Sequence, residues 1–455
     1  MNQIHFIAIG GAIMNQLAIA LKRHGYIVTG SDDEITDPAK TNLQNAGLLP
    51  IELGWYPDKI ISSIDAVVLG MHAKSDNPEL QKALKLGIKV VSFPEYIYEI
   101  SKNKKRIVVA GSHGKTTITS MIMHILKMQG FEFDYVVGAK VQGFEQSVKL
   151  SDAPLIIIEG DEYPASVIEK KPKIFFYHPH ITVLSGIAWD HINVFPTYEN
   201  YFSQFIHYLS DLERGTTVFY NTEDNEVNRA IELAGNKLNS VGYSTPEYYY
   251  QNGFPVITCE SNEYKLSVFG KHNILNMQAA IDVCMQLGIS KMDCYNAITS
   301  FTGAARRLEK ILETDGIVAY RDFAHAPSKL KATLNAVREA YPEYLLIACF
   351  ELHTFSSLNA AFLSEYANSL DAADIPIVFY SNHAIALKGL PELNTQTVYS
   401  YFKRKDLIVI DNKENLIVEI KSKLIEIKKP VFLLLMSSGS FEGIDWNDVC
   451  SHPIS

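Results

Sequence analysis

Apolar and polar positions alternate regularly along most of this chain. Short apolar runs are separated by amphipathic stretches of helical period, a pattern typical of α/β architecture with mainly parallel sheets. We predict strands at residues 4–9, 27–29, 66–69, 89–91, 107–110, 155–158, 174–176, 181–184, 317–320, 345–349, 375–379, 407–410 and 431–435. Helices are expected between the strands, among them residues 118–128 and 273–287.

The length of the chain predicts several domains. Its 455 residues exceed what one hydrophobic core usually supports, since domains commonly hold about 100–200 residues. We expect a Rossmann-like domain at 1–104, a central P-loop-type domain at 105–303 and a second Rossmann-like domain at 304–455. The charged cluster at 102–106 is interpreted as a solvated linker rather than a nucleic-acid patch. In open sheets of this kind, ligands bind at the carboxyl ends of strands.

The composition and net charge of the chain argue against some classes of protein. The chain is 47% hydrophobic and 20% charged, as globular proteins are, and its net charge of −10 argues against a general nucleic-acid binder. The five scattered cysteines include no CxxC pair, and we expect no basic leader. The apolar runs are shorter than the roughly 18 residues of a membrane span. We therefore predict a cytoplasmic protein that uses neither membrane nor nucleic acid.

The clearest chemical signal follows the predicted strand 107–110. It reads Gly111-Ser112-His113-Gly114-Lys115-Thr116-Thr117 and leads into a helical stretch, the context of a phosphate loop. Glycines let backbone N–H groups approach phosphates, Lys115 supplies a cation, and the Thr116 hydroxyl suits Mg²⁺. The full pattern has a glycine at 109, where this chain has Val109. The alternative is a tight turn with a chance lysine.

Two later strand ends carry groups suited to a metal ion. Glu159-Gly160-Asp161-Glu162 follows the strand 155–158 and resembles a site where a carboxylate holds Mg²⁺, although a solvated acidic strand end is the alternative. Asp190-His191 follows the strand 181–184. Asp190 can orient the imidazole, and neutral imidazole is a common metal ligand.

Weaker signals stand near both ends of the chain. Gly10 and Gly11 form half of a dinucleotide fingerprint in which Ala8 replaces the first glycine, and the next strand ends at Ser31-Asp32. Each of the remaining candidates has an easy structural explanation when taken alone. They are His272, Asn273, Asn276, Arg307, Asp322 and His325.

Taken in order, these motifs resemble those of the Mur ligase family over essentially the whole chain. The family's phosphate loop is matched by residues 111–117, its central Glu by Glu159, and its Asp-His by Asp190-His191. Three further matches complete the series. His272-Asn273 with Asn276 meets His-Asn-x-x-Asn, Gly303 with Arg307 meets Gly-x-x-x-Arg, and Asp322, His325 and Pro327 meet Asp-x-x-His-x-Pro.

The resemblance implies an ATP-dependent ligase that needs Mg²⁺ and joins a carboxylate to an amine through an acyl phosphate. Lys115 would act on the transferred phosphoryl group. Thr116 and Glu159 would hold one Mg²⁺, and His191 with Glu159 or a neighbouring residue would hold a second. His325 would lie near the reaction centre.

The resemblance also implies where the ligands bind. Residues 111–117 would hold ATP, with His272 and Asn273 near the adenine, Arg307 at phosphate and Asp322 at ribose. Asn276 is also implied to bind the nucleotide. The residues implied for the other substrates are Gly10, Gly11, Ser31, Asp32, His72 and His353. The partners implied are UDP-N-acetylmuramate and an amino acid or peptide, and the chain would be a monomer or homodimer.

The amine substrate stays open within this branch of the family. One member of the branch adds L-alanine and another adds L-alanyl-γ-D-glutamyl-meso-diaminopimelate, and residues 159–163, 175–177, 190–195 and 436–444 look more like the second. A proline and an arginine are expected near Leu352 and His353, so this chain departs there. An arginine would suit a substrate carboxylate.

Other classes of protein fit less of the chain. A folate-type ligase lacks the dinucleotide-like first block, and a P-loop motor needs an arginine finger that we cannot identify. A nucleotide sensor without turnover is the remaining alternative.

Overall fold

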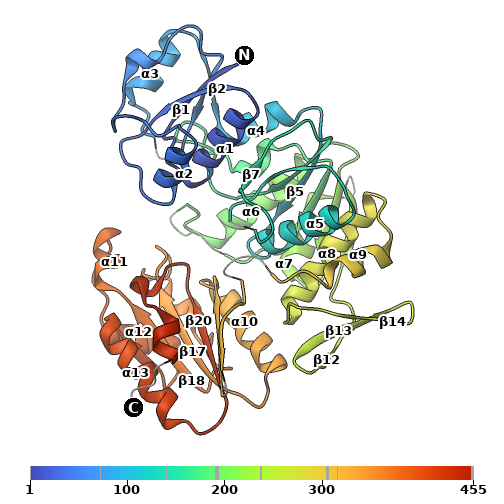
Figure 1. Ribbon diagram of the computed structural model, residues 1–455, viewed down its shortest axis with the longest axis vertical. Coiled ribbons are helices and arrows are strands. Elements are labelled where there is room, and N and C mark those ends of the chain that lie inside the picture. The colour runs from blue at the N-terminus through green and yellow to red at the C-terminus, as the bar shows by residue number, and fades with distance from the viewer. Residues whose placement is uncertain are drawn as a thin grey trace. The chain divides into compact units, whose positions relative to one another are not determined.

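The computed structural model describes residues 2–71, 73–139, 141–189, 194–235, 238–303, 307–314 and 316–451. The chain forms two compact units (Figure 1). The first unit comprises Met1–Ile187, Phe202–Tyr243 and Ala279–Ile289, and the second comprises Ala188–Tyr201, Ser244–Gln278 and Ser290–Ser455. Parallel strands alternate with helices in both, so the predicted α/β class is confirmed.

The first unit begins with a four-stranded parallel sheet. Its order is β2 (Ile27–Ser31), β1 (Gln3–Ile7), β3 (Ala66–Leu69) and β4 (Lys89–Ser92). The helices of this part are α1 (Ala12–Arg23), α2 (Ala39–Asn45), η1 (Pro57–Lys59), α3 (Pro78–Lys85) and α4 (Phe93–Ser101). Helix α4 starts with a capping box between Ser92 and Glu95, which satisfies donors at the helix start.

A seven-stranded sheet follows in the same unit. Its order is β11 (Asn239–Tyr243), β10 (Thr217–Asn221), β9 (Ile181–Leu184), β5 (Lys105–Ala110), β8 (Leu155–Glu159), β6 (Asp134–Val136) and β7 (Val148–Lys149). All neighbouring pairs are parallel except β6 and β7. The accompanying helices are α5 (Lys115–Met128), η2 (Lys173–Phe176), α6 (Tyr198–Ser210) and α7 (Asn225–Ala234). The central position of β5 places the phosphate loop at the middle of the sheet edge.

One hydrophobic core joins these two sheets. It extends from Phe6 of the first sheet and Leu17 of α1 to Val108 and Ile158 of the second sheet. All four side chains are fully buried. The two sheets of the first unit therefore share apolar packing rather than only a stretch of chain.

The second unit contains a small antiparallel sheet and a six-stranded sheet. The small sheet is β12 (Tyr249–Gln251), β13 (Phe254–Cys259) and β14 (Asn262–Lys265). The larger one has the order β15 (Glu309–Thr314), β16 (Ile317–Asp322), β20 (Val431–Met436), β17 (Leu345–Leu352), β18 (Ile375–Tyr380) and β19 (Ile408–Ile410), and only β15 is antiparallel to its neighbour.

Helices cover both faces of the six-stranded sheet (Figure 1). They are α10 (Pro327–Ala340), η3 (Leu363–Tyr366), α11 (Asn382–Leu387), α12 (Thr395–Phe402), α13 (Lys413–Glu426), η4 (Phe441–Gly443) and α14 (Trp446–Ser451). Alternate residues of β17 enter different cores, with Ala348 in one and Ile347 and Cys349 in the other. This period of two is what a sheet buried on both faces requires. Helices α8 (Lys271–Gln286) and α9 (Lys291–Ile298) precede this sheet in the chain.

One predicted strand is wrong. Residues 174–176 form the 3₁₀ helix η2 instead. Pro172 opens the turn, Phe175 N–H donates to the Pro172 carbonyl (3.2 Å), and Ile174 N–H donates to the Asp161 carbonyl (3.2 Å). The run is apolar because Ile174 packs into the interior, not because it belongs to a ladder.

The predicted solvated linker is also wrong in part. Arg106 is only 5% exposed, and its guanidinium donates to the carbonyls of Tyr177 and His178 through Nε and of Ser101 through Nη1. Lys104 Nζ donates to Asp134 Oδ2 at 2.7 Å. Two of the cations therefore fix the connection between α4 and β5 by hydrogen bonds.

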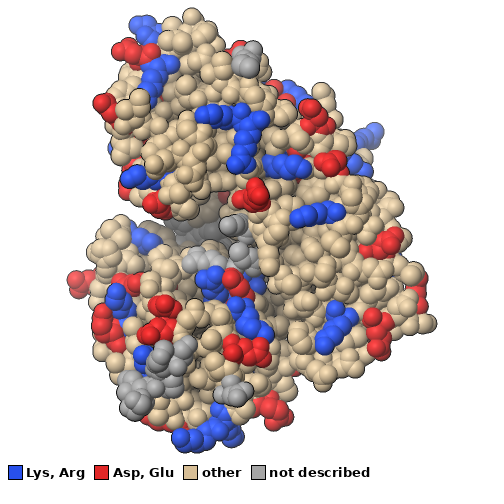
Figure 2. Space-filling view, viewed as in Figure 1, with Lys and Arg blue, Asp and Glu red and all other residues tan. Residues whose placement is uncertain are grey.

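In the ranges that the structure describes, no helix is both long and apolar enough to span a bilayer. Acidic and basic side chains are both present on the visible face of each unit, rather than one continuous basic face (Figure 2).

A buried polar group ties the first sheet together. Glu79 at the start of α3 accepts hydrogen bonds from His5 Nε2 (3.1 Å) and Tyr56 N–H (2.7 Å), and His5 and Glu79 are fully buried. Burial alone would raise the pKa of Glu79, but the hydrogen bonds from His5, Ser31 and the Tyr56 N–H outweigh it and lower that pKa. A lowered carboxyl pKa adds stability above the unfolded-state value, and that stability is lost as the pH falls through the folded-state value.

We expect Glu79→Gln to lower the free energy of unfolding by roughly 3 kcal/mol at neutral pH, because it leaves buried partners of a carboxylate unsatisfied. The difference from wild type shrinks below pH about 4.3, where the unfolded carboxyl also takes a proton. Urea unfolding at several pH values measures this. Glu99→Gln is the matched control, since its pairs with Lys89 and Lys102 are on the surface. Equal losses in both variants would contradict the prediction.

Candidate active site

The phosphate loop lies between β5 and α5, at the centre of the seven-stranded sheet. Gly111 has φ +119° and Gly114 has φ +78°, backbone conformations that favour glycine. A Cβ on Gly111 would lie 2.5 Å from Ser185 Oγ. These constraints leave the N-terminal end of α5 open to a phosphate, whose charge favours that end of a helix.

Lys115 is the first residue of α5 and carries a buried charge. Its Nζ donates to the Gly111 carbonyl (2.6 Å) and to Glu162 Oε2 (2.7 Å). Burial alone would lower the pKa of Lys115, but the nearby carboxylates of Glu162, Asp161 and Glu159 outweigh burial and raise it. The ammonium group is therefore protonated throughout the neutral range.

The predicted metal carboxylate lies beside the loop. Glu159 ends β8, and its Oε1 accepts a hydrogen bond from the Thr116 hydroxyl (2.7 Å). Its Oε2 accepts one from Gly138 N–H (2.8 Å). Hydroxyl and carboxylate oxygens are the hard donors that Mg²⁺ prefers. The third predicted ligand, His191, lies outside the described residues, as does Asp190.

Three residues of this site have no assigned role in the sequence prediction. Glu162 is the partner of Lys115, and its signal in the sequence is its place as the third carboxylate of the cluster 159–162. Ser185 follows β9, and its hydroxyl donates to the Ala110 carbonyl (3.1 Å). Gly186 lies under the His113 ring, where a Cβ would approach within 1.9 Å. The sequence signal for Ser185 and Gly186 is weaker, because they are only a pair of small residues that follow an apolar run.

The second unit brings together three residues predicted to bind nucleotide. Asp322 ends β16 and accepts hydrogen bonds from Leu308 N–H (2.7 Å) and Ala324 N–H (2.9 Å). Burial lowers the pKa of His272; Asp322 opposes that shift and Arg307 adds to it. His272 is therefore neutral at pH 7. The Arg307 guanidinium also lies 4.8 Å from the ring centre of Phe323.

The other predicted residues of this unit have local partners. Asn273 Nδ2 donates to the Phe269 carbonyl (2.9 Å), and both Asn273 and Asn276 are buried. His325 Nδ1 is 2.9 Å from the Phe323 carbonyl oxygen. His353 follows β17, separate in sequence from this group, with its Nδ1 3.8 Å from Glu351 Oε1.

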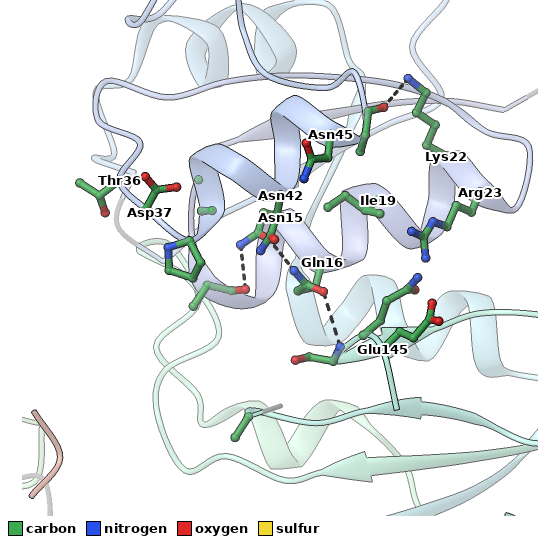
Figure 3. Close-up of a pocket in the computed structure, with 18 of the residues that line it drawn as sticks. Asn15, Gln16, Ile19, Lys22, Arg23, Thr36, Asp37, Asn42, Asn45 and Glu145 are labelled. Carbon is green, nitrogen blue, oxygen red and sulfur yellow. Dashed lines mark hydrogen bonds between the residues drawn. The ribbon is translucent and has the colours of Figure 1, made fainter. Parts of the chain in front are cut away.

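At the amino end of the first unit, a cavity of about 1030 Å³ adjoins the Gly10 loop. Figure 3 shows side chains of α1 and α2 on its wall, including Asn15, Gln16, Asn42 and Asn45. Gln16 Nε2 donates to Asn15 Oδ1 at 2.8 Å. Carboxamides both donate and accept, so this wall suits a polar ligand that carries hydroxyl or amide groups.

Of the remaining predicted residues, Gly10 lines this cavity. Gly10 N–H donates to Asp32 Oδ2 (2.7 Å), and burial raises the pKa of Asp32 although this hydrogen bond opposes the shift. Ser31 is fully buried and accepts a hydrogen bond from Lys59 Nζ (3.1 Å). Gly11 precedes α1 as its N-cap. His72 lies outside the described residues.

Sequence comparison places the chain among known enzymes. Residues 3–105 match the Mur ligase family catalytic domain, and residues 109–284 match the Mur ligase middle domain. The UDP-N-acetylmuramate–L-alanine ligase of a Sulfurihydrogenibium species is 32% identical over 383 residues, covering 83% of this chain and 82% of the relative. The UDP-N-acetylmuramate–L-alanyl-γ-D-glutamyl-meso-2,6-diaminoheptandioate ligase of Haemophilus influenzae is 29% identical over 352 residues, covering 74% and 77%.

Comparison of structures supports the fold. The crystal structure of the UDP-N-acetylmuramate–alanine ligase of Thermotoga maritima has a TM-score of 0.71 with 21% identity and covers 97% of each chain. The phosphate loop and its carboxylates therefore stand in the fold of an ATP-dependent ligase that forms amide bonds. This chain belongs to the Mur ligase family.

We expect Lys115→Ala to reduce ADP formation by at least about a thousandfold, because the loop loses the cation that meets the transferred phosphoryl group. Lys127→Ala, at the exposed end of the same helix, is the matched control and keeps near wild-type turnover. Since Lys115→Ala leaves buried Glu162 without its cation, the double variant Lys115→Met/Glu162→Gln separates stability from catalysis. A double variant that melts like wild type yet turns over ATP normally would contradict the assignment.

Proposed function

We propose that the chain joins the carboxylate of UDP-N-acetylmuramate to the amino group of L-alanyl-γ-D-glutamyl-meso-diaminopimelate, through an acyl phosphate. The observation that carries the ligase chemistry is the arrangement of Lys115, Thr116 and Glu159 around the phosphate loop. UDP-N-acetylmuramate appears in the names of relatives that match most of the chain. The peptide is favoured by the motifs at 159–163 and 436–444.

The chemistry needs ATP because a carboxylate oxygen is a poor leaving group. The muramyl carboxylate attacks the γ-phosphorus, the bond to the β,γ-bridging oxygen breaks, and ADP leaves. The amine, after losing a proton, attacks the acyl carbon. The new C–N bond forms as the C–O bond to phosphate breaks, which releases inorganic phosphate. The protein contributes mainly positioning and charge neutralisation.

The residues of the first unit suit this first step. Lys115 carries a permanent positive charge to the transferred phosphoryl group. The Thr116 hydroxyl and Glu159 would hold a Mg²⁺ ion, whose charge stabilises the phosphate oxygens when it is bound. Our prediction adds His191 as a ligand of a second ion.

The candidate binding residues are found in both units. Gly10 and the carboxamides beside it would hold the polar sugar nucleotide. His272, Asn273, Arg307 and Asp322 stay the candidates for the nucleoside and phosphate of ATP. The grouping of His272, Arg307 and Asp322 in the second unit supports this assignment.

L-Alanine is the second candidate for the amine substrate. The specific observation in its favour is the 32% identity with a UDP-N-acetylmuramate–L-alanine ligase over most of both chains. Both candidates end in the same type of bond, so the choice of amine is a question of binding at the second unit rather than of the ATP chemistry.

We expect phosphate release from ATP in the presence of Mg²⁺ and UDP-N-acetylmuramate to require the tripeptide, and mass spectrometry to find the muramyl-peptide product. Parallel reactions contain L-alanine, or no amine. Turnover with L-alanine alone would replace the peptide by the second candidate. No phosphate release with either amine would overturn UDP-N-acetylmuramate as the substrate.

We expect Glu159→Gln to raise the Mg²⁺ concentration for half-maximal turnover by roughly tenfold or more, because the ion loses a charged oxygen ligand. Asp161→Asn is the matched control from the same acidic cluster, since its carboxylate pairs with Lys173 instead. Magnesium titrations of phosphate release measure both variants. An unchanged Mg²⁺ requirement in Glu159→Gln would remove this residue from the metal site.

A further inference from the structure

The small sheet β12–β14 carries no residue predicted to bind a substrate, but hydrogen bonds attach it to α10. The hydroxyl of Tyr248, which precedes β12, donates to Glu339 Oε2 at 3.0 Å, and the Tyr250 hydroxyl lies 3.5 Å from the same oxygen. Glu339 stands in the last turn of α10. At the turn between β12 and β13, a Cβ on Gly253 would lie 3.7 Å from the Ala340 carbonyl oxygen. The small sheet therefore lies against the carboxyl end of α10.

Tyr250 also contacts the chain just before α8. Its hydroxyl oxygen accepts a hydrogen bond from Gly270 N–H at 3.2 Å, and its ring packs against the core of the second unit. Burial raises the pKa of Tyr250 to about 12, although the hydrogen bond from Gly270 opposes this shift, so the hydroxyl is neutral at pH 7. A neutral hydroxyl accepts one hydrogen bond and donates another. One oxygen of Tyr250 therefore connects Gly270 to Glu339.

Gly270 is buried and is fixed from two further sides. Its φ of +92° favours glycine, and a Cβ there would lie 2.3 Å from Ala336 Cβ, so α10 passes directly against it. The same Cβ would lie 3.1 Å from His272 Cε1, which places the imidazole ring against this glycine. The Gly270 carbonyl accepts a hydrogen bond from Asn273 N–H (2.9 Å) in the first turn of α8. A shift of Gly270 would therefore move His272.

The start of α8 and the end of β16 are held by one core. Phe269 packs edge-on against Tyr320 of β16, with 5.6 Å between the ring centres, and both belong to the same cluster of buried residues. Tyr320 stands two residues before Asp322, which ends that strand. Asp322 in turn lies near enough to His272 to affect its pKa. The position of His272 relative to Asp322 therefore depends on the segment that contains Phe269 and the glycine after it.

We propose that the small sheet β12–β14 holds the start of α8 in place for ATP, and that Tyr250 is the residue that positions His272 through Gly270. The inference rests on the proposed function, which assigns His272 to the binding of ATP. Tyr250 acts on the protein backbone and not on the nucleotide. The affinity for nucleotide therefore depends on its hydroxyl, whereas the chemical step does not.

The test measures binding of the non-hydrolysable analogue AMP-PNP with Mg²⁺ by calorimetry, which needs neither UDP-N-acetylmuramate nor the amine. We expect Tyr250→Phe to raise the Kd about fivefold, because the buried Gly270 N–H loses the hydroxyl that accepts from it. In turnover assays the KM for ATP rises by the same factor, while kcat and the other KM values stay within about twofold of wild type. Tyr249→Phe is the matched control, since its hydroxyl donates to Glu263 instead.

Two further variants test how the effect reaches the nucleotide. In a His272→Ala background, Tyr250→Phe should change the Kd by less than about twofold, because the ring that Tyr250 positions is gone. Glu339→Ala removes the carboxylate that accepts the proton of the Tyr250 hydroxyl, so the Kd should rise by a smaller factor than in Tyr250→Phe. Thermal melting shows whether each variant is folded. Because Glu339 is exposed, Glu339→Ala decides the question should Tyr250→Phe fail to fold.

The outcomes separate this inference from the proposed function. A wild-type Kd in folded Tyr250→Phe and Glu339→Ala, or an equal rise in Tyr249→Phe, overturns the role of the small sheet. An equal rise in the wild-type and His272→Ala backgrounds overturns the route through His272. A wild-type Kd in His272→Ala alone removes His272 from the nucleotide site, and this inference with it. Absence of turnover with either amine overturns the proposed substrates, whereas the AMP-PNP measurement still decides the role of Tyr250.

Discussion

The phosphate loop is arranged around one largely buried cation. Lys115 keeps its charge inside the first unit because carboxylates arrive from the end of the neighbouring strand, and Glu162 contacts it directly. That arrangement requires β8 to run parallel beside β5 and to end level with the loop. It also requires Gly111 to pass close to Ser185, so a third strand, β9, is drawn into the same edge. The order of the strands therefore determines which carboxylates lie near Lys115.

Most of the fold was predictable because the apolar runs are long and regular. Some of the strands that the sequence prediction missed, such as β12 and β14, are short and mostly exposed and carry few apolar residues. The prediction also missed β10 and β13, although most of their residues are buried. Residues 174–176 show the opposite failure, in which an apolar run is buried without joining a sheet. Arg106 shows that a charged residue next to other charges can still be buried when backbone carbonyls surround its guanidinium.

The sequence predicts those candidate site residues that stand at fixed spacings in a motif. It does not predict the contacts that residues make only when the chain is folded. The loop at 111–117 and Glu159 carry recognisable spacings, and the structure places Thr116 and Glu159 in contact. Glu162 has a role that depends on strands meeting at an edge, which no local pattern encodes. The close approach of the His353 ring to Gly439, which follows a different strand, is likewise set by the fold.

The core shared by the two sheets of the first unit limits which segments of this protein can be exchanged with those of a relative. The shared core and the carbonyls bound by Arg106 mean that the first hundred residues bury their apolar surface against the next sheet. An exchange of this segment between relatives would expose that surface unless the residues around Tyr177 were exchanged with it. The first hundred residues and the sheet that follows them therefore have to be exchanged together in a chimaera.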